Sequence, residues 1–332
     1  MIKYYDINNT LSKQRLFNFV IGGRGMGKTY GCKKKVIENF LKKGEQFFYL
    51  RRFDTDVKPS EIRNFFNDVE AEFPGVEFRV YNGCFLINGE VAGWYKSITT
   101  AVQLRSVPFP NVTLIIFDEF IVNDGAHRYL PGEVTGFLDC YSTIARDRDV
   151  PVLFLSNAIT MTNPYFMYFN ITFEHGQRTK LTEFISVELV YSETYAEHIK
   201  ETKFGKLIAG TQYGDFNIEN KFILDTETFI SKMPAGASYL CTFIVSESAT
   251  ELCKAGLYLD SKQHLYYISN KVDQTNQRTY SLTMRDHSPD TILALRQNPY
   301  IRVMVDAYCS GKVRFTSQNV KNLLTPVIKR MM

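Results

Sequence analysis

The sequence predicts an α/β protein with a mainly parallel sheet, followed by a smaller α+β part. Residues 15–21 form an apolar strand that leads through a glycine-rich loop into a helical segment ending near Lys43. Further short apolar strands alternate with helical patterns, which is the order of βαβ units. These strands are expected at 46–50, 112–117 and 152–155. The chain after about residue 229 is β-rich and then helical, which predicts the second part.

The loop after the first strand has the spacing of a phosphate-binding P-loop, Gly-x4-Gly-Lys-Thr. Its glycines let main-chain N–H groups point at phosphate oxygens. The lysine ammonium reaches the β- and γ-phosphates, and the threonine hydroxyl can ligate Mg²⁺. A tight turn is the plainer interpretation, but it does not explain the lysine and threonine. The expected nucleotide-binding residues are Gly22, Gly23, Arg24, Gly25, Met26, Gly27, Lys28 and Thr29.

An apolar strand that ends in Asp118-Glu119 has the Walker B pattern. Asp118 is expected to hold Mg²⁺ together with Thr29, and Glu119 to polarise the attacking water as general base. Strands often end in acidic turn residues, but a P-loop upstream favours the catalytic interpretation. The two motifs predict ATP and Mg²⁺ as ligands and ATP hydrolysis, in which Lys28 also stabilises charge.

These motifs place the first part among P-loop NTPases of the additional-strand type. In that class a polar residue at the end of the next strand senses the γ-phosphate, and Asn157 is the candidate. A strand-end Asx turn is the alternative for Asn157.

Several arginines are candidates for contact with phosphate. Arg146 and Arg148 follow the helix predicted at 133–145, and we favour Arg146 as an arginine that acts on a neighbouring subunit's site. Pairing with the adjacent aspartates, favoured by the helix dipole, is the alternative. Arg24 could act within its own site. Arg51 and Arg52 could reach phosphate, DNA or a neighbour, or pair with nearby aspartates.

Other elements are predicted less directly. An amphipathic helix is expected at 61–73, followed by a β-meander with turns at Asn82-Gly83 and Asn88-Gly89. Strands are expected to extend the sheet at 163–169, 171–173 and 182–190, with a polar helix at 194–203. Helices are also expected at about 290–310, broken near Pro299, and at 317–330.

The expected organisation is an ATPase domain at 1–200, a Gly- and Asn-rich linker at 201–228 and a C-terminal domain at 229–332. An active nuclease needs several carboxylates that converge on two metal ions. Candidate carboxylates occur here, but their spacing does not predict a cluster. They are Asp260, Asp273, Asp286 and Asp290.

Composition sets wider limits. The net charge is +4, and the whole excess lies in residues 201–332, which is compatible with a polyanionic partner or with ordinary surface variation. The six cysteines are scattered singly, as in reduced proteins of the cytosol. No signal peptide and no membrane-spanning segment are expected.

Seven segments carry a wider resemblance. They are Leu16–Thr29, Gly44–Arg52, Phe109–Val112, Ile116–Phe120, Leu155–Ala158, Asn163–Phe166 and Lys203–Gly214. In them the chain resembles the DNA-packaging ATPases of small podophages that replicate by protein priming. The resemblance covers about residues 15–215 well and the remainder loosely.

This resemblance implies a homomeric ring, a pentamer in the family, seated on the portal of an empty capsid. ATP hydrolysis would drive double-stranded DNA into the head, in the host cytoplasm. Arg146 matches the family's trans-acting arginine, and Arg105 stands where the family carries a lysine that reaches toward the neighbouring site. The C-terminal domain would be a degenerate RNase H-like nuclease. Some members dock on a structural RNA, which this sequence leaves open.

Two other functions remain as alternatives. The ATP state could control partner binding in a nucleotide switch or assembly module that does not translocate DNA. A large-terminase-like enzyme would also cut DNA, which the scattered aspartates disfavour.

Overall fold

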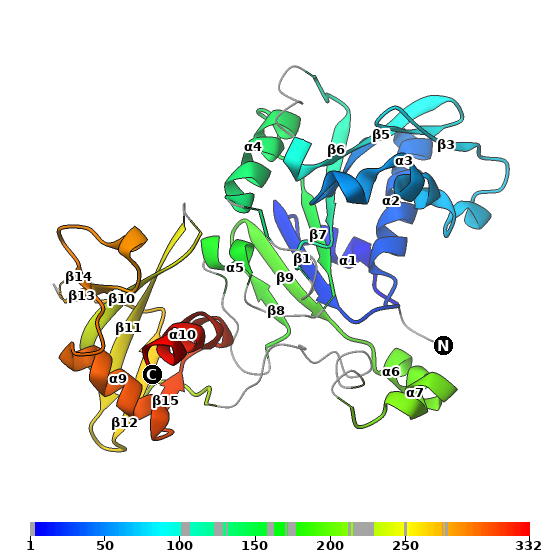
Figure 1. Ribbon diagram of the computed structural model, residues 1–332. Helices are drawn as coiled ribbons and strands as arrows, with labels where there is room; N and C mark the ends of the chain where they lie inside the picture. The colour runs from blue at the N-terminus through cyan, green and yellow to red at the C-terminus, as the bar shows by residue number, and fades with distance from the viewer. Residues whose placement is uncertain are drawn as a thin grey trace. The chain divides into compact units, whose positions relative to one another are not determined.

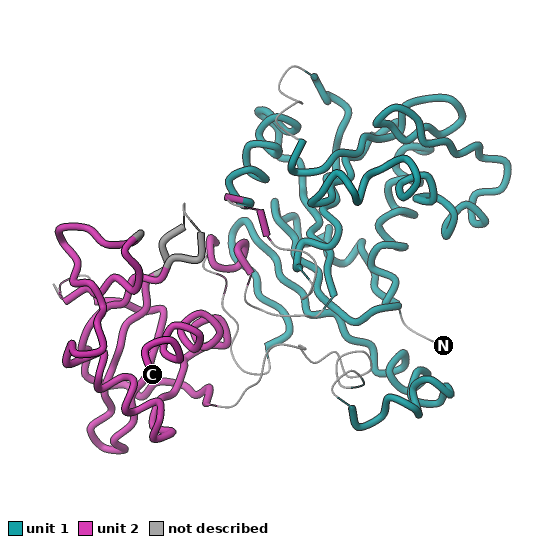
Figure 2. The backbone as a smooth tube through the Cα atoms, viewed as in Figure 1, with its two compact units in different colours: residues 1–128, 133–159, 176–223 teal, residues 129–132, 160–175, 224–332 magenta. Residues whose placement is uncertain are grey.

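Figure 1 shows the protein as a computed structural model. The structure describes residues 4–100, 107–122, 129–130, 132–157, 163–169, 171, 177–211, 214, 229–248, 251–273, 275 and 278–332. The chain divides into two compact units, coloured separately in Figure 2. Unit 1 is residues 1–128, 133–159 and 176–223, and unit 2 is residues 129–132, 160–175 and 224–332.

Unit 1 is built on a nine-stranded sheet of order β3-β4-β5-β2-β6-β7-β1-β9-β8. The six strands from β5 to β9 in this order pair in parallel, and only β3, β4 and β8 at the edges are antiparallel. The strands are β1 (Phe17–Gly22), β2 (Gln46–Arg51), β3 (Phe78–Tyr81), β4 (Cys84–Ile87), β5 (Glu90–Ser97), β6 (Val112–Asp118), β7 (Val152–Ser156), β8 (Thr179–Leu181) and β9 (Ile185–Val190). β7 lies between β1 and β6, which confirms the additional-strand arrangement.

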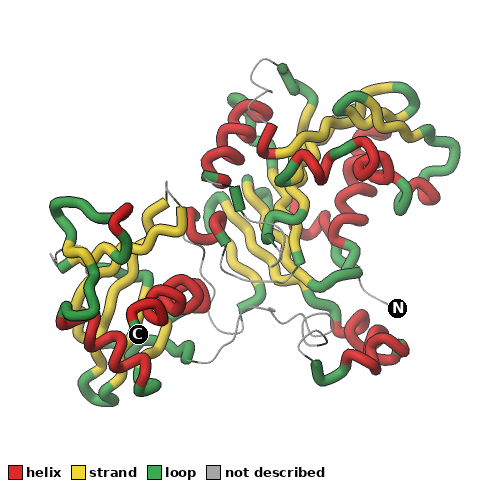
Figure 3. The backbone as a smooth tube through the Cα atoms, viewed as in Figure 1, coloured by secondary structure: helices red, strands yellow, loops and turns green. Residues whose placement is uncertain are grey.

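Helices cover both faces of this sheet, as Figure 3 shows. Alternate residues of each strand point to opposite faces. On one face Val20, Tyr49 and Ile116 pack with the helix α2 (Lys28–Lys43). On the other face a cluster of aromatic rings packs against the helix α4 (Glu133–Ala145). The sheet contributes Phe17, Phe117 and Phe154 to this cluster, and α4 contributes Phe137 and Tyr141.

The remaining helices of unit 1 are short. They are α1 (Ile7–Leu11), α3 (Pro59–Ile62), α6 (Glu193–Glu201) and α7 (Lys203–Ile208). The meander and its two Asn-Gly turns are confirmed, with positive φ at all four turn residues. The start of the predicted linker forms α7, and most of the stretch from 209 to 228 lies outside the described residues.

The continuous helix predicted at 61–73 is wrong. The segment consists of α3 and two short 3-10 turns, Arg63–Phe66 and Glu70–Glu72. Phe65 and Phe66 are both buried, and both rings contact Phe85. The tertiary packing of these two rings therefore overrides the helical periodicity of the sequence.

Unit 2 contains a six-stranded sheet of order β14-β13-β10-β11-β12-β15. Its strands are β10 (Ser238–Ser248), β11 (Glu251–Asp260), β12 (Leu265–Ser269), β13 (Thr279–Ser281), β14 (Ile292–Leu293) and β15 (Val313–Phe315). β10, β11 and β12 form an antiparallel meander, and β13 and β14 add parallel strands beside β10. The helices α9 (Pro299–Cys309) and α10 (Gln318–Met331) complete the core of unit 2.

Two predictions in unit 2 are wrong. Residues Pro164–Tyr168 form the helix α5, not a strand, because Asn163 caps it through Phe166 N at 3.0 Å and Pro164 occupies its first position. Residues 290–298 are not helical, since α9 begins only at Pro299. Among the described residues no helix has the length and apolarity needed to cross a bilayer.

Candidate functional site

The glycine-rich loop joins β1 to α2 at the carboxyl end of the sheet. Gly25 and Gly27 have φ angles of 77° and 79°, a region that other residues rarely adopt. Lys28 begins α2, and its Nζ donates to the carbonyl oxygens of Gly22 at 2.8 Å and Gly23 at 2.7 Å. Burial lowers the pKa of Lys28 to about 8, an effect that the nearby Asp118 opposes. The ammonium is therefore held at the mouth of the loop, where phosphate binds in such loops.

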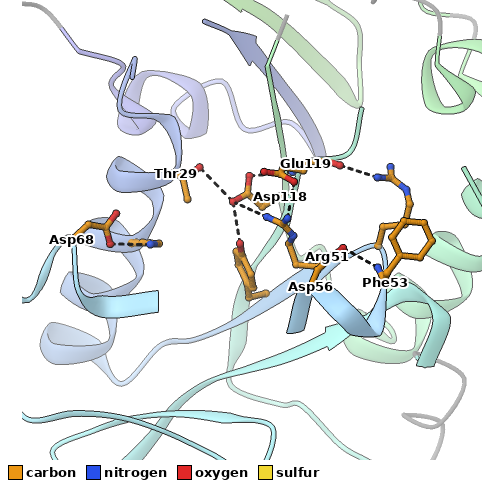
Figure 4. A network of polar contacts seen from close by, with 10 residues as sticks. Thr29, Arg51, Phe53, Asp56, Asp68, Asp118 and Glu119 are labelled. Atoms are coloured by element: carbon orange, nitrogen blue, oxygen red, sulfur yellow. Dashed lines mark hydrogen bonds and ion pairs between the residues drawn. The ribbon is translucent and has the colours of Figure 1, made fainter. Parts of the chain in front are cut away.

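Thr29 and Asp118 lie together across the gap between α2 and β6 (Figure 4). Thr29 Oγ1 is 3.4 Å from Asp118 Oδ2, which also accepts a hydrogen bond from Tyr49 at 3.0 Å. Burial and the Asp118 carboxylate raise the pKa of Tyr49, so its hydroxyl stays a donor. Mg²⁺ takes one or two protein oxygens and completes its shell with phosphates and water. The pair of oxygens from Thr29 and Asp118 fits that need.

Glu119 follows β6 with a φ angle of 60°, unusual for a residue with a side chain. Its carboxylate accepts from Arg51 Nη2 at 2.6 Å, and Arg51 Nη1 lies 3.8 Å from Asp118 Oδ2 (Figure 4). Burial lowers the pKa of Arg51, but Tyr49, Asp118 and Glu119 outweigh it, so the pKa is raised. The alternative considered for Arg51, pairing with the nearby Asp54 or Asp56, is not seen. Asp54 accepts from Ser97 and Thr100, and Asp56 accepts from the amide of Phe53.

These groups border one cavity of about 270 Å³. Four elements supply its walls, namely the P-loop, α2 and the carboxyl ends of β6 and β7. The residues around it are Arg24, Gly25, Met26, Gly27, Lys28, Thr29, Tyr30, Asp118, Glu119, Ser156 and Asn157. The structure thus brings the predicted P-loop, Walker B and sensor residues together at one place.

The roles of Tyr49, Arg52 and Glu133 were not predicted from the sequence. Tyr49 and Arg51 point to the face of β2 that carries α2, so both reach Asp118. Arg52 points to the opposite face, where it forms a buried ion pair with Glu133 of α4. The alternation of a strand could have assigned the two arginines to opposite faces.

The other candidate arginines differ in their surroundings. Arg148 donates four hydrogen bonds to main-chain carbonyls of its own chain, between 2.7 and 2.9 Å. The acceptors are Phe109, Pro110, Val112 and Ile144. Arg146 directly follows α4, has a φ angle of 54° and is exposed. Arg105 lies outside the described residues.

Three of the four candidate aspartates of unit 2 accept hydrogen bonds from residues two or three positions away in the chain. Asp260 accepts from Lys262 N, Asp273 from Thr275, and Asp286 from Thr283. In the part of the chain that the structure describes, no three His, Cys, Asp or Glu side chains are placed to hold a metal ion together.

Comparisons with known proteins agree with this architecture. The profile of the family described as "Podovirus DNA encapsidation protein (Gp16)" matches residues 2–332. The DNA packaging protein of Bacillus phage B103 is 35% identical over 324 residues, covering 97% of this chain and 99% of that protein. The DNA packaging protein of Bacillus phage phi29 is 33% identical over 331 residues, covering 99% and 98%.

Solved structures of phage DNA-packaging proteins are also similar to this chain. A chain of the phi29 viral genome packaging motor assembly is similar with a TM-score of 0.76 and 33% identity, over 99% of this chain and 100% of that one. The N-terminal domain of the phi29 DNA packaging ATPase is similar with a TM-score of 0.54 and 38% identity, over 57% of this chain and 97% of that one. The chain therefore belongs to the podovirus DNA encapsidation protein (Gp16) family.

Proposed function

We propose that the protein is an ATP-driven motor that moves double-stranded DNA into a preformed capsid as a homomeric ring. The observation that carries this proposal is the cavity of about 270 Å³, around which Lys28, Asp118 and Glu119 meet. A lysine, a cation-binding carboxylate and a base are the groups that phosphoryl transfer to water needs. Because the chain belongs to a DNA encapsidation family, we assign the energy of ATP hydrolysis to the movement of DNA into the capsid.

In this site each group has one task. Lys28 holds the β- and γ-phosphates, and Thr29 and Asp118 hold Mg²⁺, which when bound neutralises charge on the phosphates. Glu119 orients the attacking water and accepts its proton. Asn157, which follows β7 and borders the same cavity, is the sensor of the γ-phosphate, and Arg24 contacts that phosphate from the P-loop.

A second cavity of about 740 Å³ adjoins the first and shares Gly25, Gly27 and Tyr30 with it. Tyr4 and Tyr5, from the segment that precedes α1, also border it. Since the first cavity takes the phosphates, the nucleoside of ATP belongs in this second one. A tyrosine ring offers a base an apolar surface on which to stack.

The remaining assignments concern partners. Arg146 is the arginine offered to a neighbouring subunit, because it is exposed whereas Arg148 is engaged within its own chain. Arg105 is a weaker candidate for the same interface. We propose a ring of five subunits on the capsid portal, acting on the procapsid in the host cytoplasm, with a structural RNA as an open possibility. Unit 2 contacts nucleic acid or the portal and does not cut DNA.

The test is the ATPase rate measured against duplex DNA concentration, with oligomeric mass measured in parallel. A motor is expected to be stimulated by DNA, to lose DNA binding as salt rises, and to form a ring under the same conditions. Glu119→Gln should bind ATP but hydrolyse it poorly, while Glu90→Gln, an exposed site on β5, serves as the matched control. Slow turnover unaffected by DNA would favour the nucleotide switch, and cleavage of plasmid DNA would favour the terminase.

A further inference from the structure

Arg52 and Glu133 form a charged pair that no contact with nucleotide explains. Arg52 follows β2 and is 5% exposed, and Glu133 is the first residue of α4 and is 3% exposed. Arg52 Nε and Nη2 donate to the two carboxylate oxygens of Glu133 at 2.8 and 2.9 Å. This is a bidentate pair, the strongest arrangement that these two side chains can make.

The same guanidinium also holds the main chain beside the catalytic base. Nη1 donates to the carbonyl oxygen of Glu119 at 3.0 Å, and Nη2 donates to that of Phe120 at 2.5 Å. The guanidinium carbon lies 5.8 Å from the centre of the Phe117 ring. Arg52 thus lies beside the Phe117 ring of β6 and holds the carbonyls of Glu119 and Phe120, the two residues that follow the strand.

The segment that Arg52 holds, Glu119 and Phe120, begins with a residue in an unusual backbone conformation. Glu119 has a φ angle of 60°, and its amide donates to Asp118 Oδ1 at 3.1 Å. A left-handed conformation of a non-glycine residue persists only where its surroundings enforce it. The two peptide groups that flank the Glu119 Cα are each held by a hydrogen bond, one to Asp118 Oδ1 and one from Arg52, and these bonds provide that enforcement. The turn brings the Glu119 side chain to the cavity on the α2 face, opposite to the face on which Arg52 lies.

We propose that Arg52, held by Glu133, is a positioning residue that fixes the backbone of Glu119 for hydrolysis. It acts through the carbonyls of Glu119 and Phe120 and makes no contact with nucleotide. This inference rests on the proposed function, in which Glu119 is the general base. Loss of the pair should therefore slow the chemical step while leaving the affinity for ATP in place.

The test separates positioning from folding. Arg52→Lys keeps a positive charge beside Glu133 but loses the planar fork that reaches both carbonyls. Arg52→Met/Glu133→Leu removes both charges and fills the space with apolar side chains, which avoids an unpaired buried charge. Both proteins should bind a fluorescent ATP analogue within about threefold of wild type, yet show single-turnover hydrolysis at least about tenfold slower, as misplaced reacting groups do.

Glu188→Gln is the matched control, because Glu188, on β9 of the same sheet, pairs with Lys13 and Thr10 and does not border the cavity of about 270 Å³. It should change thermal stability and leave the rate per folded subunit near wild type. Wild-type single-turnover rates in the Arg52 variants would overturn the inference, and so would a parallel loss of ATP affinity and rate. If the double variant does not fold, Arg52→Lys decides alone. A wild-type protein without ATPase activity would instead refute the proposed function.

Discussion

Arg51 Nη2 donates to Glu119 Oε2 at 2.6 Å, and Nη1 of the same guanidinium lies 3.8 Å from Asp118 Oδ2. The Arg51 guanidinium is thus shared by two carboxylates, that of Asp118, which is assigned to Mg²⁺, and that of Glu119, which is assigned to the attacking water. A positive charge at this distance from Asp118 opposes the binding of another cation there.

The first prediction follows from this competition. Arg51→Met should lower the Mg²⁺ concentration for half-maximal ATPase activity, by about threefold for a charge several ångströms away in a partly wet site. Arg51→Lys keeps the charge and should stay near the wild-type requirement. The measurement is a Mg²⁺ titration of the ATPase rate at saturating ATP, and a higher requirement in Arg51→Met would contradict the prediction.

The second prediction separates the two P-loop side chains. Lys28→Ala should weaken ATP binding about tenfold or more with or without Mg²⁺, because it removes a charged hydrogen bond worth about 1.5–3 kcal/mol. Thr29→Ala should lose only the part of the affinity that Mg²⁺ adds. Calorimetric titration with and without the metal ion distinguishes them. Equal losses in both conditions for Thr29→Ala would remove it from the metal site.

The third prediction concerns the two arginines after α4. Arg148→Ala removes four hydrogen bonds to main-chain carbonyls and should lower Tm by about 5 °C, from a loss of ~2 kcal/mol. Arg146→Ala should leave Tm nearly unchanged but abolish ATPase activity of the ring. Mixing it with Lys28→Ala subunits should restore activity, since each kind supplies what its neighbour lacks. Mixtures that stay inactive would count against an arginine acting in trans.

The fourth prediction tests the shape of the P-loop. A Cβ at Gly25 would lie 1.9 Å from the Tyr195 hydroxyl, whereas a Cβ at Gly83 would meet nothing within 4 Å. Both glycines have positive φ, so Gly83→Ala measures the backbone cost alone, about 1 kcal/mol. Gly25→Ala should cost more and weaken ATP binding, and Tyr195→Ala in the same chain should recover part of the loss. Equal stability of Gly25→Ala and Gly83→Ala, from chemical denaturation, would refute the steric argument.

The fifth prediction addresses the second cavity. Tyr30→Ala should weaken ATP binding about tenfold, the effect of removing one aromatic stacking partner from a base. The affinity for inorganic tripolyphosphate, which lacks a nucleoside, should change little. Competition binding with both ligands gives the comparison. A parallel loss for both would place the nucleoside elsewhere.

Local signals explain what the sequence could predict. The helices Lys28–Lys43 and Glu133–Ala145 have the predicted bounds, and Gly44 ends the first of them with a φ angle of 68°. A glycine-rich loop, a left-handed cap and an apolar periodicity each act within a few residues. The helix at Pro164–Tyr168 also carries a local signal, the Asn-Pro start, which the apolar residues around it obscured.

The contacts around Glu119 could not be predicted in this way. Arg51 and Glu119 are 68 residues apart, and Arg52 and Glu133 are 81 apart. They meet because β2 pairs with β6, a strand order that the sequence leaves open. The packing of Phe65 and Phe66 against Phe85 likewise depends on the place of the meander in the sheet.

The helix α4 joins two of the groups discussed above, since Glu133 begins it and Arg146 directly follows its end. Inserting or deleting one residue within it would turn Arg146 by about 100° around the axis and move it by about 1.5 Å, while Glu133 stayed in place. The number of residues in α4 therefore sets both the distance and the angle between Glu133 and Arg146. Residue types along its exposed side are free to change during evolution, but insertions and deletions should be confined to the connections outside it.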